Sequence, residues 1–488
     1  MGRGIARVAA GAGHRVVLYD MDDGALASAK VELHRYLERD VAKGRLDGEE
    51  AAAIADRVEY ATEPAALTGA VLVIEAIVED LDIKVALLRQ VEQLVPIDTI
   101  IATNTSSLSI TAIGARLERP HQVAGLHFFN PAPVMPLVEV VAGADSSPQV
   151  LETLTAIVVE WGKTPVRAAS TPGFIVNRVA RPFYGEALRI VEESLASPIE
   201  VDEIVTGAAG FSMGPFALMD LVGLDVNLAV SKSVYRQTFH DPRFAPNQIQ
   251  QQLVDAGRLG RKAGRGFYNY EVDEPNEEPR MVAPAGEVSA ALIHGAVVEM
   301  GGLVERLEAG GIELSAGFGP ATGIAIGSTL LWPSDGRPVS LVAKQLPDLA
   351  VVGLDEALDW STASTVAVAG SDDAALGSAA ALLATAGLQT RLVGDGPGLV
   401  VLRIMAQLAS VAADAVLKGV ATAQDVDTAM QLGTNYPIGP LEWADRYGAA
   451  RVVTVLDNMA DFYGEPRYRP SSLLRRAAAS DSKIREPR

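Results

Sequence analysis

The sequence predicts an α/β protein in which a doubly wound parallel sheet precedes an all-helical domain, with this pair of domains present twice. Helix and strand patterns alternate through the first third of the chain, which is typical of such a sheet. Residues from about 171 to 270 are mostly helical, and several of them recur 225 positions later. These observations together predict a duplicated two-domain unit.

The first third alternates between helices and short apolar strands. Residues 2–13 are Ala-rich and helical, and RVVLYD at 15–20 is a β-branched strand. Further elements follow in order: a helix at about 23–44, a strand at VEYAT, a strand at 70–77, a helix at 83–94, a strand with its loop at 99–107, and a strand at 123–131. This order favours a parallel doubly wound sheet.

The later residues repeat this plan. An acidic, Pro-rich segment separates the halves and is predicted to be a linker. The expected domains are an α/β domain at 1–168, a helical domain at 169–270, the linker at 271–287, a degenerate α/β domain at 288–394 and a second helical copy at 395–488. The repeat rests on four matches at a spacing of 225: Pro172-Gly173 with Pro397-Gly398, Asp202 with Asp427, Gly214-Pro215 with Gly439-Pro440, and Asp220 with Asp445.

Composition excludes several classes of protein. The net charge of −20 argues against a nucleic-acid partner, because phosphate binding needs a basic face. No apolar run approaches the roughly 18 to 20 residues of a membrane span, and no signal peptide opens the chain. The chain contains no Cys, which removes disulfides and Cys-ligated metals and suits a cytoplasmic protein. No metal site is predicted.

The N-terminus resembles part of a dinucleotide-binding unit, which runs strand, Gly-rich turn, helix, strand and acidic residue. Asp20 is the acidic residue, and Gly2, 18 positions before it, fits the third glycine of the turn. Gly11-Ala12-Gly13 precedes a strand instead of opening a helix, so its context is wrong. We expect that the first strand and two glycines are missing because Met1 is an internal methionine taken as the start. A real truncation is the alternative, and the acidic strand end favours NAD over NADP.

Three motifs in order carry a family resemblance: NTSSLSI at 104–110, HFFNPAPVMPLVEVV at 127–141 and PGFIVNR at 172–178. They resemble the 3-hydroxyacyl-CoA dehydrogenase family, in particular the long bacterial 3-hydroxybutyryl-CoA or phenylacetate-pathway type with a duplicated second half. The resemblance is strong to about residue 270 and weaker beyond. It implies a Rossmann-like NAD-binding domain and a helical domain like the C-terminal domain of 6-phosphogluconate dehydrogenase, both duplicated.

The resemblance implies a catalytic pair of His127 and Glu139. Oxidation of an alcohol beside a nicotinamide needs a base for the hydroxyl proton. His127 ends a strand where the ligand crevice of such a sheet should open, and a carboxylate would fix its tautomer. A histidine alone in this place could equally be a satisfied strand-end residue.

The family match places Ser106 and Asn177 at the substrate's oxygens. Ser106 has an alternative role as a helix cap. Asn177 lies inside an apolar helical run, where a polar amide needs a partner.

Other residues resemble the family's cofactor and CoA contacts. The resemblance gives Asn130, Glu79, Lys84 and Lys262 to the cofactor, and Ser106 to the cofactor as well as to the substrate. Read without the family, Glu79 and Lys84 would be a solvated helix start and Lys262 a basic surface turn. Lys43 and Arg45 resemble the CoA-facing region, and a solvated helix end is the alternative for both.

The second half is expected to be inactive. The spacing of 225 puts Leu402 where Asn177 stands, and no counterpart of HFFNP follows. Single-copy relatives pair through their helical domains, so the second helical copy is expected to dock against the first as an internal pseudo-dimer in a monomer or homo-oligomer.

The resulting expectation is an NAD-dependent L-3-hydroxyacyl-CoA dehydrogenase, with acyl-CoA as its partner. Two alternatives stay open: a dehydrogenase of a free 3-hydroxy acid, and a degenerate acyl-CoA-binding or scaffold protein. The sequence does not indicate the acyl chain length or the pathway.

Overall fold

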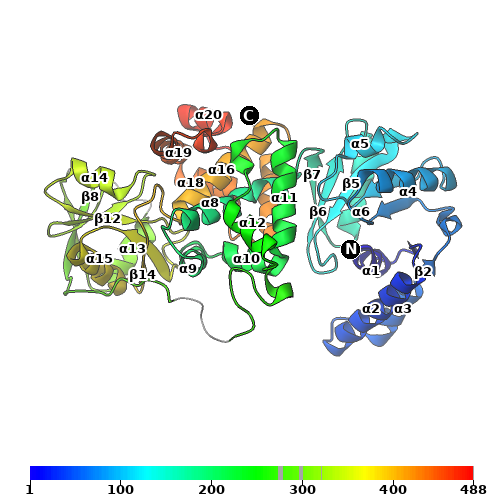
Figure 1. Ribbon diagram of the computed structural model, residues 1–488, viewed down its shortest axis with the longest axis horizontal. Helices are drawn as coiled ribbons and strands as arrows, with labels where there is room; N and C mark the ends of the chain where they lie inside the picture. The colour runs from blue at the N-terminus through cyan, green and yellow to red at the C-terminus, as the bar shows by residue number, and fades with distance from the viewer. Residues whose placement is uncertain (273–277, 296–299, 320, 487–488) are drawn as a thin grey trace. The chain divides into compact units, whose positions relative to one another are not determined.

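The computed structural model describes residues 1–272, 278–295, 300–319 and 321–486, so residues 273–277 of the predicted linker lie outside it. The chain divides into two compact units (Figure 1). Unit 1 comprises Met1–Asn177 and Gly419–Thr434, and unit 2 comprises Arg178–Lys418 and Asn435–Arg488. A segment of the second helical copy therefore belongs to the unit that contains the first α/β domain.

Unit 1 is an α/β unit in which two helices separate the first strand from the second. Its helices are α1 (Gly2–Gly11), α2 (Asp23–Ala42), α3 (Gly48–Asp56), α4 (Leu81–Leu94), α5 (Ile110–Gly114), α6 (Pro148–Glu160) and α17 (Ala423–Thr434), and α7 (Val176–Val179) runs across the boundary with unit 2. Its strands are β1 (Val16–Tyr19), β2 (Val58–Ala61), β3 (Leu72–Glu75), β4 (Ile100–Thr103), β5 (Val123–Phe128), β6 (Leu137–Ala142) and β7 (Thr164–Ala169).

The predicted alternation of strands and helices is confirmed. The sequence analysis did not predict α3, α5, α6, β6 or β7. The sheet is also not wholly parallel: β3, β4 and β5 are parallel, but β6 runs antiparallel to β5. Only residues 129–136 join β5 to β6, which is too short for the crossover that parallel neighbours need. Strands β1 and β2 form a separate parallel pair.

Alternation along β5 assigns its side chains to two faces of the sheet. Leu126 and Phe128 join a buried cluster with Leu154 of α6. Because neighbouring residues of a strand point to opposite faces, Gly125 and His127 face the other way. A Cβ on Gly125 would lie 2.9 Å from Ile110 of α5, so α5 packs on the face that carries His127.

Unit 2 combines a helical bundle with a second sheet. Its helices are α8 (Arg181–Glu192), α9 (Pro198–Ala209), α10 (Pro215–Val222), α11 (Leu224–Gln237), α12 (Gln248–Asp255), α13 (Gly301–Ala309), α14 (Val339–Gln345), α15 (Asp373–Thr385), α16 (Val401–Leu417), α18 (Pro440–Tyr447), α19 (Ala449–Tyr463) and α20 (Ser472–Ser480). Its strands are β8 (Ala290–His294), β9 (Glu313–Gly317), β10 (Gly323–Ile326), β11 (Thr329–Pro333), β12 (Ala350–Leu354), β13 (Thr365–Ala369) and β14 (Gln389–Leu392), in the sheet order β14-β13-β12-β11-β10-β8-β9.

The second sheet repeats the first. Strands β11, β12, β13 and β14 pair parallel, antiparallel and parallel, in the same order as β4, β5, β6 and β7. Within unit 2 the helical copies pack together through α8 and α16. Helix α16 is apolar on nearly all sides and almost wholly buried, as a central helix should be.

Each sheet also bonds to the opposite helical copy. In unit 1, the N–H of Ala169 at the end of β7 donates to the carbonyl of Val420 at 2.8 Å. In unit 2, the N–H of Gly394 donates to the carbonyl of Leu195 at 2.7 Å. The donor Gly394 lies 225 residues after the donor Ala169, and the acceptor Val420 lies 225 residues after the acceptor Leu195, so the same bond is made twice. Each sheet therefore makes an equivalent hydrogen bond from its edge to a segment of the other helical copy.

Helix α17 packs against β6 and β7 with almost no clearance at Gly433. A Cβ there would lie 2.7 Å from Leu137 and 3.0 Å from Val176, two buried side chains of unit 1. Only glycine lets the helix approach this closely.

We predict that Gly433→Ala destabilises the protein by about 1–3 kcal/mol, because the added methyl group overpacks this contact. Gly185→Ala in α8 is the matched control, since nothing lies within 4 Å of its Cβ position. An alanine there should be neutral or stabilising because alanine is the better helix former. Denaturant unfolding of both variants measures the difference, and equal effects would contradict the close packing of α17.

Candidate active site

The structure brings His127 and Glu139 together in the buried centre of the sheet. The two residues face each other across β5 and β6, and His127 Nδ1 lies 2.6 Å from Glu139 Oε2. The side chains are 7% and 1% exposed. A carboxylate only accepts hydrogen bonds, so Nδ1 carries the proton and Nε2 is the ring nitrogen that can accept another.

Glu139 also binds the chain near α7. Its second oxygen, Oε1, accepts hydrogen bonds from the backbone N–H groups of Ile175 at 2.9 Å and Val176 at 3.1 Å. The first N–H groups of a helix have no partner within it, so the carboxylate satisfies them. These bonds offset the cost of burying the carboxylate and fix the backbone beside Asn177.

Two aromatic rings hold the imidazole, and the sequence analysis missed both. The His127 ring centroid lies 4.6 Å from that of Phe129 and 5.9 Å from that of Phe174. Gly173 and Phe174 have φ angles of 75° and 45°, so a left-handed turn brings Phe174 to the ring. The Pro-Gly pair before Phe174 is the signal that could have indicated this turn.

Asn177 and Ser106 also come together. The Asn177 Nδ2 group lies 3.5 Å from the Ser106 carbonyl oxygen. The alternative role of Ser106 as a helix cap is wrong, because Ser109 is the residue whose hydroxyl caps α5.

Glu79 and Lys84 support the loop that carries Ser106. Glu79 Oε1 accepts from the N–H groups of Ser106 and Ser107, both at 3.0 Å. Burial would raise the pKa of Glu79, but hydrogen bonds from Thr105 and Ser107 and the charge of Lys84 outweigh it and hold that pKa below its usual value. Lys84 is 1% exposed and 2.8 Å from Glu75, so its alternative role in a solvated helix start is wrong.

Gly2 and Asp20 are arranged as an NAD pyrophosphate and ribose would require. Helix α1 begins at Gly2, where a Cβ would lie 3.8 Å from Ala76 after β3 and 3.9 Å from Leu18 of β1. The N-terminus of α1 therefore lies beside both strands, and its free N–H groups suit a phosphate. Asp20 is exposed directly after β1 and suits ribose hydroxyls.

The remaining predicted contacts lie on the surface. Asn130 is exposed after β5, while Asn104, which the sequence analysis missed, accepts from the N–H of Phe128 at 2.8 Å. Lys43 and Arg45 are exposed beyond α2, and Arg45 lies 3.5 Å from Asp40. In unit 2, Lys262 is exposed and pairs with Asp225 at 2.5 Å.

A helix N-terminus and an acidic strand end for a dinucleotide, together with a buried histidine–carboxylate pair, define an NAD-dependent dehydrogenase. A model of the 3-hydroxyacyl-CoA dehydrogenase NAD-binding domain matches residues 1–171. The C-terminal domain of that family matches both 173–270 and 398–486, which confirms the duplication. A model of the 3-hydroxybutyryl-CoA dehydrogenase reduced Rossmann-fold domain matches 331–397.

Individual relatives agree with these matches. The chain is 41% identical over 484 residues to a 3-hydroxyadipyl-CoA dehydrogenase of Escherichia coli, covering 99% of this chain and 96% of that one. A crystal structure described as 3-hydroxybutyryl-CoA dehydrogenase from Escherichia coli matches with a TM-score of 0.90 at 40% identity, over 98% and 96% of the two chains. The (S)-3-hydroxybutyryl-CoA dehydrogenase of Ralstonia eutropha matches 55% of this chain and 95% of its own, with a TM-score of 0.54 at 39% identity.

This chain belongs to the 3-hydroxyacyl-CoA dehydrogenase family and is an NAD-dependent oxidoreductase. Among the described residues, no helix is long and apolar enough to cross a membrane. The same residues contain no group of three or more His, Cys, Asp or Glu side chains that could hold a metal ion.

The register of the second sheet identifies the counterparts of the candidate catalytic residues. Thr164 pairs with Leu137 and Gln389, 225 later, pairs with Thr365, so Ala367 corresponds to Glu139. The N–H of Asp355 donates to the carbonyl of Ala367, which places Asp355 where His127 stands. The register of β11 with β12, compared with that of β4 with β5, places Asp335 at the position that corresponds to Ser106.

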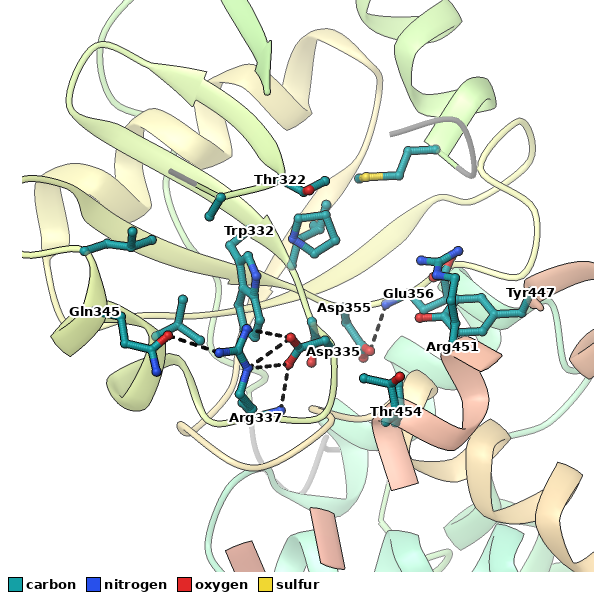
Figure 2. A pocket seen from close by; sticks show the side chains of 18 of the residues that line it. Thr322, Trp332, Asp335, Arg337, Gln345, Asp355, Glu356, Tyr447, Arg451 and Thr454 are labelled. Carbon is teal, nitrogen blue, oxygen red and sulfur yellow. Dashed lines mark hydrogen bonds and ion pairs between the residues drawn. The ribbon is translucent and has the colours of Figure 1, made fainter. Parts of the chain in front are cut away.

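A cavity of about 620 Å³ occupies this counterpart of the catalytic site, and Asp335, Asp355 and Glu356 line it (Figure 2). Asp355 accepts from the N–H groups of Val400, Val401 and Leu402 at 2.8–3.1 Å. Asp355 therefore accepts hydrogen bonds from the N–H groups at the start of α16, as Glu139 does at the start of α7. No histidine is among the residues that line this cavity.

Two raised pKa values accompany this cavity. Burial raises the pKa of Asp355 to about 6. Burial and the neighbouring Asp355 raise the pKa of Glu356 to about 7, although the charge of Arg451 opposes them. The folded protein therefore holds these protons at pH values where the unfolded chain has released them.

We predict that Glu139→Gln lowers kcat by about 10²- to 10⁴-fold. The glutamine oxygen can still accept from Ile175 and Val176, but its amide donates toward His127 and favours the wrong tautomer. Steady-state NADH formation measures the effect. Glu152→Gln, at an exposed position of α6, is the control, and an unchanged kcat in Glu139→Gln would remove this carboxylate from the chemistry.

We predict that Glu356→Gln raises the melting temperature at pH 8 but not near pH 4. A carboxyl whose pKa is raised in the folded state costs stability as pH rises from its unfolded pKa of about 4 toward about 7. The amide removes this cost and keeps an oxygen for the N–H groups of Trp360 and Ala357. Thermal unfolding at both pH values, with the exposed Glu308→Gln as control, tests it, and a gain independent of pH would contradict it.

Proposed function

We propose that this chain oxidises the C3 hydroxyl of an L-3-hydroxyacyl-CoA to the 3-oxo group, with His127 as the base. The observation that carries the proposal is the 2.6 Å contact between His127 Nδ1 and Glu139. It fixes the tautomer in which Nε2 accepts a proton, and a base for this reaction must accept one at that point.

The proposed steps follow from the residues around the imidazole. His127 Nε2 removes the hydroxyl proton, and Glu139 stabilises the imidazolium that forms. NAD, when bound, accepts the hydride from C3. Asn177 and Ser106, which meet through a 3.5 Å contact, are proposed to hydrogen-bond the substrate's oxygens. In the reverse direction, His127 returns the proton as a 3-oxoacyl-CoA is reduced.

We propose 3-hydroxybutyryl-CoA and 3-hydroxyadipyl-CoA as the substrates to test first. The Escherichia coli relative that shares 41% identity with 99% of this chain is named for the adipyl substrate. A solved Escherichia coli structure, matching 98% of this chain, is described by the butyryl substrate. Glu79, Asn130 and Lys262 are proposed as cofactor contacts, with the buried Lys84 acting through its 3.3 Å ion pair with Glu79, and Lys43 as a CoA contact.

The alternative of a free 3-hydroxy acid substrate would favour a lysine base over the histidine pair. Lys84 is a poor candidate because it is buried in an ion pair with Glu75. A scaffold role without catalysis would leave the buried His127–Glu139 pair unexplained. A cytoplasmic location and an internal pseudo-dimer remain predictions.

We predict that His127→Gln abolishes turnover while leaving NAD affinity largely intact, because glutamine is not a base at neutral pH. NADH oxidation with acetoacetyl-CoA measures turnover, and NADH fluorescence titration measures affinity. His121→Gln, at an exposed position before β5, is the matched control. Turnover that survives in His127→Gln would identify another base.

A further inference from the structure

Lys163, in the turn between α6 and β7, gives all its side-chain hydrogen bonds to one loop of unit 1. Its Nζ lies 2.8 Å from the carbonyl oxygen of Ala132, 3.2 Å from that of Pro133 and 2.8 Å from that of Met135. An ammonium group has three N–H donors and no acceptor, so these three bonds use every donor. Among the described residues, this cation is therefore bound by backbone carbonyls and not by a carboxylate.

The loop that receives these bonds, residues 129–136, joins β5, which carries His127, to β6. Phe129 is the first residue of the loop, and its ring centroid lies 4.6 Å from that of His127. Asn130, the proposed cofactor contact, is the second. A displacement of the loop would therefore move both the ring that supports the imidazole and the residue proposed to contact NAD.

The same loop packs on the first turn of α1. A Cβ on Gly4 would lie 3.3 Å from Ala132 Cβ and 3.3 Å from Pro133 Cδ. The N–H groups that begin α1 suit the pyrophosphate of a dinucleotide. Burial lowers the pKa of Lys163, and the charge of Arg7 in α1 lowers it further, so the ammonium group also lies within reach of this helix. The loop thus connects the imidazole with the helix proposed to bind the coenzyme.

Three carbonyl oxygens directed at one point repel one another unless a cation lies between them. The lysine supplies this cation, so the shape of the loop depends on it. Hydride transfer requires the reacting atoms to be about 3–3.5 Å apart, and a displacement of about 1 Å can lower the rate by about 10²-fold. Precise placement of the loop is therefore worth a dedicated cation.

The second half of the chain keeps the turn but not the lysine. In the first half, the N–H of Lys163 donates to the carbonyl of Val158 at 3.0 Å. At the positions 225 residues later, the N–H of Leu388 donates to the carbonyl of Leu383 at 3.1 Å. The turn itself therefore forms with an apolar side chain, and the lysine stands in the half that contains His127.

We propose that Lys163 is a positioning residue, which holds the loop at 129–136 in the shape that NAD binding and hydride transfer require. It acts through Asn130 toward the coenzyme and through Phe129 toward the imidazole. The inference rests on the proposed function, since it assumes that hydride is transferred beside His127.

The test compares Lys163→Leu with the wild type by NADH fluorescence titration and by steady-state kinetics. Leucine is the residue in the equivalent turn of the second half, so this variant is expected to fold. It should raise the dissociation constant for NADH about tenfold and lower kcat by about 10- to 10²-fold, because the loop is displaced. The KM for the acyl-CoA substrate should change less than about twofold, because the lost interaction is on the coenzyme's side. The pH dependence of kcat should not change, since His127 remains the base.

Arg167→Leu is the matched control. Arg167 is an exposed cation of β7, four residues after Lys163, so the variant removes the same charge from the same segment. Its NADH dissociation constant, kcat and KM should match those of the wild type.

Wild-type values of the NADH dissociation constant and kcat in Lys163→Leu would overturn the proposal, and so would a lower stability to denaturant as the only change. Equal increases in the NADH dissociation constant and the acyl-CoA KM would overturn it too, because the effect would not be specific to the coenzyme. A wild-type enzyme that binds NADH but oxidises no 3-hydroxyacyl-CoA would instead reject the proposed function, and the NADH dissociation constants would still decide the role of Lys163.

Lys163→Arg is the second variant if Lys163→Leu does not fold. It keeps the charge but spreads the donors over a planar group that does not match three converging carbonyls, so it should raise the NADH dissociation constant about threefold. An unchanged constant in this variant would overturn the proposal.

Discussion

The carboxylate of Glu139 is the group on which both His127 and the start of α7 depend. One oxygen holds His127, and the other holds the backbone of Ile175 and Val176. Burying this charge would be costly if any of those bonds were lost. The same group therefore fixes the tautomer of the base and the position of the chain that leads to Asn177. Chemistry and local folding are coupled through one side chain.

The second half shows which part of this arrangement the fold itself requires. Its sheet keeps a buried carboxylate on the N–H groups that begin α16, but Asp355 supplies it from the strand position that His127 occupies in the first half. The position of Glu139 is an alanine, Ala367. The bond between strand and helix start is present in both halves, whereas an aspartate stands where the first half has His127, the proposed base, which agrees with the expected structural role of residues 288–488.

Much of the first half could be predicted from the sequence because its signals are local. The alternation of strands and helices follows from patterns within short segments. The pairing of His127 with Glu139 and the placing of Ser106 and Asn177 in one site came from the family resemblance, because 71 residues separate Ser106 from Asn177. The burial of Lys84 was harder to predict, because it depends on an ion pair with Glu75, which lies on a neighbouring strand. The interpretation of Ser106 as a helix cap was wrong, because Ser109, three residues later, caps α5.

Other features depend on contacts that no local pattern contains. Helix α17 belongs to unit 1 although its sequence matches α9 of unit 2, and only packing against β6 and β7 reveals this.

The central claim is that one half of the chain is catalytic and the other is structural, and the number of NADH molecules bound per chain tests it most directly. Fluorescence titration of the 488-residue protein at a concentration well above the dissociation constant gives that number. The account predicts one NADH per chain, bound by the half that contains His127 and Glu139. Two NADH per chain would contradict it, because the second half would then be a working coenzyme site.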